Sequence, residues 1–237
     1  MSETIGLEVA GDGVAIVSLN RPKLNIYNLA MRDELIEAFT AVRDHPEARA
    51  LLLRAEGRHF SAGADLAEFG GADSILDARR IRWERDPWVP LSTMPQPTVV
   101  ALHGYALGAG LEMALLCDFR LAAPDTVVAL PETGLGMLPS AGGTQSLTRV
   151  VRPAAGLPLV LTGERVDAAG AARRGIVQRV CEDVEADARA MAARLAALPP
   201  LAARAARRSI RAASDLALAA GLEEERRLAD LVALGRG

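Results

Sequence analysis

The sequence predicts an α/β fold with a largely buried sheet, followed by a helical C-terminal region. Through most of the chain, strand-like apolar runs alternate with turns and helical patterns, and this alternation is typical of α/β architecture. Beyond residue 183 only helical patterns rich in alanine, arginine and leucine remain. The tail therefore adds no strand to the predicted sheet.

The composition restricts the classes of protein to which the chain can belong. Half of the 237 residues are hydrophobic, enough for one large domain or a domain with an appendage. A net charge of −3 gives no basic surface for nucleic acid. Cys117 and Cys181 fit neither a metal motif nor a disulfide framework. We therefore expect a reducing, cytoplasmic setting.

The N-terminal elements follow from apolar patterning. Residues 5–10 and 14–19 are strand-like runs joined by a Gly-Asp-Gly turn, which is a hairpin signal. From Leu29 the apolar residues recur at helical spacing, and Pro46 should stop that helix. Residues 50–53 are continuously apolar, as in a strand buried on both faces.

In the middle of the chain, the pattern of charged and apolar residues predicts one surface helix at residues 74–88 and three short strands. The strands are expected at residues 99–102, 119–122 and 127–130, with a helix beginning near Ala109. The apolar stretch from 98 to 117 is long enough to span a bilayer. It contains His103, Glu112 and three glycines, so we interpret it as a buried strand and helix and expect no membrane partner.

The C-terminal part is predicted to be mainly helical from Gly143, with one further strand candidate at residues 176–180. The helical tail is interrupted at Pro199-Pro200. We place a boundary near residue 185, between a core domain of residues 1–185 and a helical region of residues 186–237.

Common catalytic and binding motifs do not match. The glycines at 104, 108 and 110 could suggest a dinucleotide loop, but Met113 stands where the third glycine of that motif belongs. Leu138 occupies the first glycine position of a nucleophile elbow around Ser140. The three histidines are dispersed, so we predict no metal site.

Two small-residue turns remain as candidates for chemistry. Residues 61–65 and 108–110 each follow a predicted buried strand, and the second turn opens a helix. Small side chains let a ligand approach backbone N–H groups, and a helix start adds unpaired donors. Facing one another, the turns would form an oxyanion hole. Taken singly, each is more simply an ordinary tight turn.

Two glutamates accompany these turns. Glu112 lies in the first turn of the predicted helix, and Glu132 follows Pro131 after a strand. Either could be a dipole partner or a solvated acid. As a pair they are more informative, because Glu112 sits in an otherwise apolar segment where a buried charge is costly. Two carboxyls in one site cannot both ionise easily, which supplies an acid and a base together.

Five segments, in this order, resemble the enoyl-CoA hydratase/isomerase (crotonase) family. The resemblance spans about residues 5–211. The segments are Asn-Arg-Pro at 20–22, HFSAGADL at 59–66, HGYALGAGLE at 103–112, Pro-Glu at 131–132 and PSAGGTQ at 139–145.

The resemblance implies a spiral of ββα units, a C-terminal helical region used in assembly, and an acyl-CoA thioester as substrate. No cofactor or metal beyond that substrate is expected, and the assembly would be a homotrimer or a dimer of trimers. The backbone N–H groups of Ala64 and Ala109 would form the oxyanion hole. The substrate-binding residues would be Ala62, Ala64, Asp65, Leu66, Ala67 and Gly108.

The presence of both glutamates favours hydration, because isomerases and other members of the family often lack one or both. Glu112 would accept a proton from water attacking Cβ, and Glu132 would donate one to Cα. An isomerase or another crotonase-type reaction is the nearest alternative. A non-catalytic acyl-CoA-binding protein is the third.

Four features depart from the usual family pattern. Ala109 stands where many relatives have glycine, His103 where asparagine is common, and Ile26-Tyr27 where Ala-Leu is usual. Tyr27 could shape the CoA side or simply pack. We also expect the chain to stop short of the last helix that relatives usually carry, which bears on CoA affinity and assembly.

Overall fold

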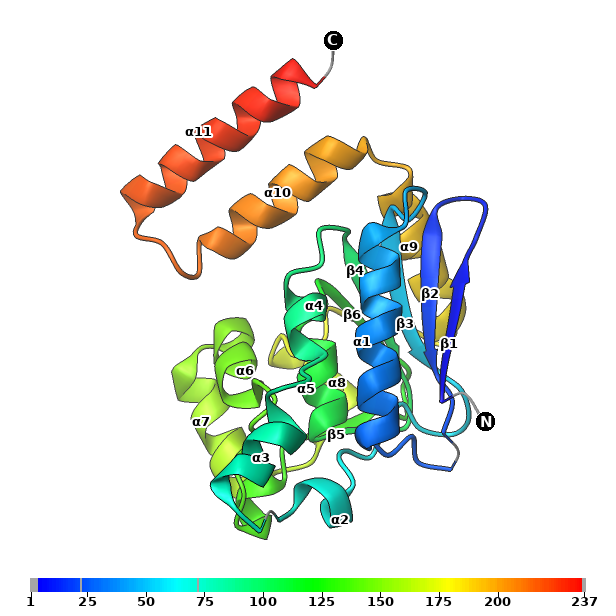
Figure 1. The fold of residues 1–237 in the computed structure, drawn as a ribbon, viewed down its shortest axis with the longest axis vertical. Coiled ribbons are helices and arrows are strands. Elements are labelled where there is room, and N and C mark those ends of the chain that lie inside the picture. Colours follow the sequence, from blue (N-terminus) through cyan, green and yellow to red (C-terminus); the bar gives the residue numbers. More distant parts are fainter. Residues whose placement is uncertain (1–3, 22, 72, 236–237) are drawn as a thin grey trace.

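The strands form two sheets in the computed structural model, which describes residues 4–21, 23–71 and 73–235. The larger sheet has the order β1-β2-β3-β4-β6-β9, and the smaller has the order β5-β7-β8 (Figure 1). Pro22 of the first family-like segment and the last two residues lie outside the described residues. The strands are β1 Ile5–Val9, β2 Val14–Leu19, β3 Ala50–Ala55, β4 Thr98–Leu102, β5 Tyr105–Leu107, β6 Phe119–Ala122, β7 Val127–Ala129, β8 Val166–Asp167 and β9 Arg179–Val180.

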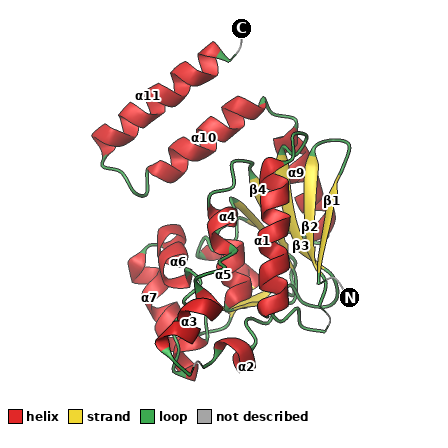
Figure 2. Ribbon diagram, viewed as in Figure 1, coloured by secondary structure: helices red, strands yellow, loops and turns green. Residues whose placement is uncertain are grey.

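Helices surround both sheets (Figure 2). They are α1 Leu29–Asp44, α2 Leu66–Phe69, α3 Ile75–Arg82, α4 Trp88–Ser92, α5 Ala109–Leu115, the 3₁₀ helix η1 Glu132–Leu135, α6 Gly143–Val151, α7 Pro153–Thr162, α8 Ala168–Arg173, α9 Val184–Ala196, α10 Pro200–Ala212 and α11 Leu218–Leu234. None of the helices in the described ranges is long and apolar enough to cross a bilayer.

The large sheet begins with the predicted hairpin and continues as parallel strands. β1 pairs antiparallel with β2, with Ile5 opposite Leu19, and β2, β3, β4, β6 and β9 then pair in parallel. Alternate residues of β3 enter two separate cores: Leu51 and Leu53 pack with α1, and Leu52 packs with α9. A sheet covered on both faces needs continuous apolar strands, which confirms the interpretation of this run.

The strands predicted in the middle of the chain are divided between the two sheets. The runs at 119–122 and 127–130 are strands, but β6 belongs to the large sheet and β7 to the small one. Short β5, between β4 and α5, was not predicted, and neither was β8. The candidate at 176–180 is reduced to the two residues of β9. Ile176 and Val177 are buried in the core ahead of that strand.

The predicted surface helix at 74–88 is wrong as a single element. The structure has two short helices, α3 and α4, with a break between Arg82 and Trp88. Pro87 lies in this break, and proline can neither donate an i→i−4 hydrogen bond nor accommodate the preceding helical turn. Asp86 then accepts a hydrogen bond from the Trp88 amide at 2.8 Å, which starts α4.

The helices α10 and α11 form a hairpin that projects from the body of the molecule (Figure 1). Asp118, which follows α5, pairs with Arg207 of α10 at 2.6 Å and with Arg211 at 3.0 Å. Arg211 also donates to the carbonyls of Leu116 and Ser92, at the ends of α5 and α4. Partly buried arginines therefore attach the hairpin to the part of the body that carries Glu112.

Candidate active site

The two small-residue turns come together in the structure. The strand-end residues Ser61 and Ala106 form a parallel bridge, and the amide of Leu107 donates to Ser61 at 3.0 Å. Gly63 has φ +105° and Gly108 has φ +50°, a region that favours glycine. A Cβ on Gly63 would lie only 3.2 Å from the Leu107 carbonyl oxygen and 3.9 Å from the Gly108 Cα.

Tyr27 orients the amide of Ala64. Its N–H donates to the Gly63 carbonyl at 2.9 Å, and its carbonyl accepts from the Asp65 amide at 2.8 Å. Tyr27 and Ala64 thus form a parallel bridge. In such a bridge the amide of Ala64, between the two bonded residues, points away from Tyr27. Within the described residues the Ala64 N–H donates no hydrogen bond. It is therefore available to a ligand.

Ala109 supplies a second available amide. It is the first residue of α5, and the first N–H groups of a helix lack intrahelical acceptors. The first intrahelical bond comes from the Glu112 amide to the Gly108 carbonyl, at 2.9 Å. The positive end of the helix dipole adds to the attraction for a negative oxygen at this position.

A cavity of about 600 Å³ unites both amides with both glutamates. Of the predicted site residues, it is lined by Ala64, Leu66, Ala109, Glu112 and Glu132. The remaining predicted binding residues lie outside this lining, with Ala62, Asp65 and Gly108 in the two turns and Ala67 in α2. The amide of Ala62 donates to the Leu24 carbonyl at 2.9 Å. Asp65 caps α2 by accepting from the Ala67 amide at 3.0 Å. Gly108 lies against the Glu132 side chain, because a Cβ added to it would be 2.5 Å from Oε1 of Glu132.

Glu112 is almost fully buried, with 3 % of its surface exposed. Burial and the neighbouring charge of Glu132 raise its pKa to about 8. Two amides oppose this rise by donating to Oε1, that of Ala141 at 3.0 Å and that of Gly143 at 2.8 Å. A side chain at Gly143 would place its Cβ 2.8 Å from the same oxygen, so only glycine allows this contact.

Glu132 is the first residue of η1 and faces the same cavity. Burial raises the pKa of its carboxyl. Its Oε2 is buried and has no hydrogen-bond partner among the described residues. Such an atom is costly unless a ligand or water satisfies it. One carboxyl of the pair is thus held by amides, and the other presents an unsatisfied oxygen.

The arrangement can polarise a carbonyl and move a proton. Two backbone donors can stabilise a developing oxyanion. Two carboxyls that cannot both ionise easily retain a shared proton and can act as acid and base. No group of three histidine, cysteine, aspartate or glutamate residues in the described ranges could hold a metal ion.

The sequence model for enoyl-CoA hydratases and isomerases matches residues 10–232. The chain belongs to the enoyl-CoA hydratase/isomerase family. A probable enoyl-CoA hydratase of Mycobacterium tuberculosis is 38% identical to this family member over 218 residues, covering 91% of this chain and 84% of the relative. The 2,3-dehydroadipyl-CoA hydratase of Escherichia coli is 37% identical over 226 residues, covering 93% and 87%.

A solved relative confirms the crotonase fold of this family member. An enoyl-CoA hydratase subunit of Geobacillus kaustophilus matches with a TM-score of 0.90 and 35% identity, covering 98% of this chain and 91% of the other. The mixed sheets and the C-terminal helices are thus those of the enoyl-CoA hydratase/isomerase family.

Sequence reasoning missed the aromatic wall of this family member's cavity. Tyr27 stacks on Phe69 with ring centroids 5.1 Å apart, and Trp88 lies 5.3 Å from Tyr27 at a tilt. All three residues line the cavity, together with Trp83. Their only sequence signal was the unusual Tyr27, because the wall joins three segments that are far apart in the chain.

Proposed function

We propose that this protein is an enoyl-CoA hydratase. It would add water across the 2,3 double bond of a 2-enoyl-CoA and form a 3-hydroxyacyl-CoA. The observation that carries the proposal is the convergence of Glu112, Glu132 and the amides of Ala64 and Ala109 on one cavity. Relatives that are 37% and 38% identical and bear hydratase names support it.

The thioester carbonyl would accept hydrogen bonds from the Ala64 and Ala109 amides. As water adds to Cβ, the electrons of the double bond move toward this oxygen, giving an enolate. The two donors stabilise the enolate more than the ground-state carbonyl. One such donor typically contributes about 3–4 kcal/mol.

The two glutamates would hold the attacking water between them. Glu112 accepts a proton from the water as the water oxygen bonds to Cβ. Glu132 gives a proton to Cα, and the carbonyl re-forms. One proton passes from the water to Glu112, and one passes from Glu132 to Cα. After the reaction Glu112 is therefore the protonated carboxyl and Glu132 the ionised one. Before another turnover a proton must return from Glu112 to Glu132, through the next water molecule or through solvent.

The hydrogen bonds support this division of roles. The amides of Ala141 and Gly143 stabilise a carboxylate at Glu112. The unsatisfied Oε2 of Glu132 is the natural place for the shared proton. With that proton on Glu132, the charge that disfavours ionisation of Glu112 is removed.

Binding and assembly follow as further parts of the proposal. Ala62, Ala64, Asp65, Leu66, Ala67 and Gly108 would hold the CoA thioester through the turns, without another cofactor. The hairpin of residues 200–234 would assemble the chain into a homotrimer or a dimer of trimers. An apolar groove between α10 and α11 and the 73% exposed Ile210 support this. The two free, buried cysteines are in keeping with a cytoplasmic setting.

The direct test is to incubate the protein with crotonyl-CoA and follow the conjugated enoyl absorbance. Hydration removes the absorbance and adds the mass of one water to the product. Isomerisation of the double bond leaves the mass unchanged. Calorimetric binding of CoA thioesters without any turnover would favour the non-catalytic alternative. Either of the last two results contradicts the proposal.

A further inference from the structure

Arg211 of α10 bonds to two helices that form walls of the cavity. Its Nη1 donates to the Ser92 carbonyl at 2.5 Å, and its Nη2 donates to the Leu116 carbonyl at 2.6 Å. Ser92 is the last residue of α4, and Leu116 directly follows α5. Both residues line the cavity. One guanidinium group therefore joins the ends of the two helices.

Asp118 fixes the orientation of this guanidinium. Its Oδ1 accepts from Nη2 of Arg211 at 3.0 Å and from Nε at 3.3 Å. Its Oδ2 accepts from the Thr98 amide at 2.8 Å and from Nε of Arg207 at 2.6 Å. Because the guanidinium is planar and is bonded to a carboxylate as well as to two carbonyls, it has little freedom to turn. The separation of the Ser92 and Leu116 carbonyls is thereby set.

The helix α5 carries the proposed chemistry at the end opposite to Arg211. It has seven residues, a length of about 10 Å. Ala109 begins it and Glu112 follows in its first turn. Beyond its other end, Arg211 bonds to the Leu116 carbonyl, and positive charge at a helix C-terminus is favourable. A displacement of that end would therefore move the Ala109 amide and the Glu112 carboxyl.

The helix α4 links Arg211 to the other oxyanion donor. Trp88, the first residue of α4, lies with its ring 5.3 Å from that of Tyr27. Tyr27 in turn forms the parallel bridge with Ala64. The contacts of Arg211 thus support the elements behind both backbone donors, from a helix that contributes no residue to the cavity lining.

We propose that Arg211 is a positioning residue for hydration, which sets the places of the Ala109 amide and of Glu112 by holding the ends of α4 and α5 together. Arg211 touches neither the substrate nor the reacting atoms. The helical hairpin therefore supports the active site of its own chain, in addition to its proposed role in assembly. The inference rests on the proposed hydratase function, because it concerns the geometry of the same site.

The test is Arg211→Lys, assayed with crotonyl-CoA. Lysine keeps a positive charge beside Asp118, but its single ammonium group cannot reproduce the fork that spans a carboxylate and two carbonyls. Misplacement of a catalytic group acts on the transition state, so kcat should fall about 10–100-fold. The KM should change by less than about threefold, because the lost alignment contributes little to ground-state binding.

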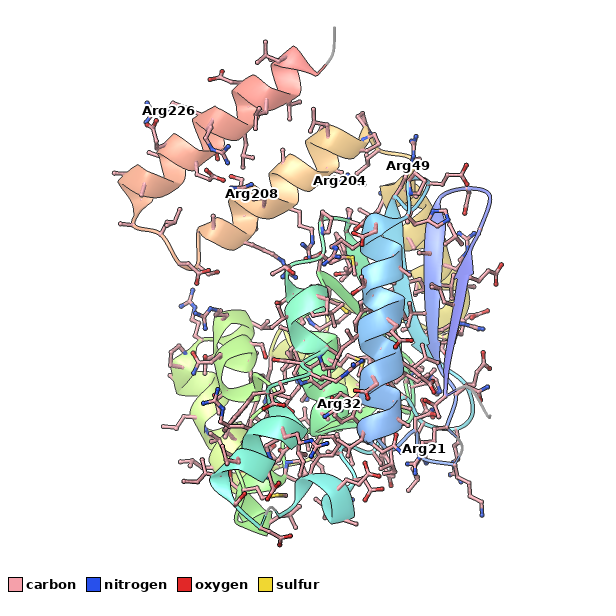
Figure 3. The ribbon with its side chains drawn as sticks, viewed as in Figure 1. Arg21, Arg32, Arg49, Arg204, Arg208 and Arg226 are labelled. Carbon is pink, nitrogen blue, oxygen red and sulfur yellow. The ribbon has the colours of Figure 1, made fainter. Side chains whose placement is uncertain are left out.

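Arg208→Lys is the matched control. Arg208 is the next residue but two before Arg211 on the same helix and is labelled in Figure 3. Its side chain is 63% exposed and pairs with Glu224 of α11. The same substitution at this position should leave kcat and KM at their wild-type values. Circular dichroism checks that both variants are folded.

A second measurement reports the position of the oxyanion donors without turnover. Butyryl-CoA is saturated and cannot be hydrated, and its thioester carbonyl can be labelled with carbon-13. Hydrogen bonds from the amides of Ala64 and Ala109 would lower the infrared stretching frequency of the bound carbonyl. We expect a smaller lowering in Arg211→Lys than in the wild type and in Arg208→Lys. A loss of folded protein would change the intensity of this band but not its frequency.

Several results would overturn the inference. These are an unchanged kcat in Arg211→Lys, a rise in KM without a fall in kcat, an equal loss of kcat in Arg208→Lys, or the same carbonyl frequency in all three proteins. Failure of Arg211→Lys to fold would also overturn it, because Arg211 would then serve the fold and not the site. A wild type that does not hydrate crotonyl-CoA overturns the proposed function. In that case the carbonyl frequencies still decide whether Arg211 positions the two amides.

Discussion

At Glu112, burial of the side chain opposes ionisation of its carboxyl. Its pKa is raised from an ordinary 4.5 to about 8 by burial and by Glu132. The amides of Ala141 and Gly143, which both donate to one carboxyl oxygen, reduce the free-energy cost of ionising Glu112 without removing it. The residue is therefore a source of pH dependence for stability as well as for chemistry.

We predict that the wild type loses stability relative to Glu112→Gln as pH rises from about 4.5 to about 8. In this window the unfolded chain releases its carboxyl protons, while the folded pair of Glu112 and Glu132 retains one shared proton, so the free energy of unfolding falls with pH. The slope approaches about 1.4 kcal/mol per pH unit at most. Urea unfolding of both proteins at several pH values measures it, and parallel curves would contradict the raised pKa.

Gly108 gives a second prediction at the scale of one residue. Its φ is +50°, and a Cβ there would lie 2.5 Å from Oε1 of Glu132. Gly108→Ala should destabilise the fold by about 1–3 kcal/mol through backbone strain and should displace Glu132, lowering kcat. Gly134→Ala is the control, because no atom lies within 4 Å of its Cβ position. Equal activity and stability in the two variants would refute this account of Gly108.

At the scale of elements, α10 is fixed by buried charge. The side chain of Arg207 is 9% exposed and pairs with Asp118, which is 19% exposed. Arg208, the next residue, is 63% exposed and pairs with Glu224. The two neighbouring arginines provide a matched comparison of a buried and an exposed ion pair on one helix.

We predict that Arg207→Met destabilises the protein by about 3–5 kcal/mol, because it leaves Asp118 with less compensation for its burial. Arg208→Met should cost less than about 1 kcal/mol, since exposed ion pairs contribute little. Chemical denaturation of both variants gives the two values. A similar loss in each would mean that Arg207 is not the anchor described above.

The elements also show what the sequence could and could not predict. The hairpin, α1, β3 and β4 follow from local patterns, and α1 ends at Asp44, ahead of the predicted stop at Pro46. The three residues of β5 are too few for a period, and their pairing with β7 is a tertiary contact. For the same reason, no local signal separates β6 from β7 into different sheets.

The candidate site was predictable where a residue type implies its own chemistry. Two glutamates and two small-residue turns could be proposed from the chain alone, and the cavity brings them together. Ala141 and Gly143 lie in a recognised segment, but the use of their amides by Glu112 depends on the fold. Trp83 and Trp88 of the cavity wall lie in a charged stretch whose pattern resembles an ordinary surface helix.

At the scale of the whole molecule, the hairpin of α10 and α11 exposes apolar residues away from the cavity. Ile210 is 73% exposed and Leu218 is 79% exposed. Arg208 and Arg226 lie on the same hairpin (Figure 3). Ile210 lines the apolar groove between the two helices, and an exposed apolar patch is typical of a protein interface, which supports assembly through these helices.

We predict that Ile210→Asp dissociates the assembly into monomers, because it places a charge in the apolar groove. Sedimentation velocity should show a trimer or hexamer for the wild type and a monomer for the variant. Leu7→Asp on the edge strand β1, where Leu7 is 43% exposed, should keep the wild-type state. A monomeric wild type, or an assembled Ile210→Asp, would contradict the proposed interface.

The central claim is that Glu112 and Glu132 together perform the hydration. The most direct test is the kcat of crotonyl-CoA hydration for Glu112→Gln and Glu132→Gln, with folding checked by circular dichroism. Loss of a positioned acid or base should lower kcat by about 10²–10⁴, and we predict a loss of this size in each variant. Undiminished hydration in either folded variant would contradict the account.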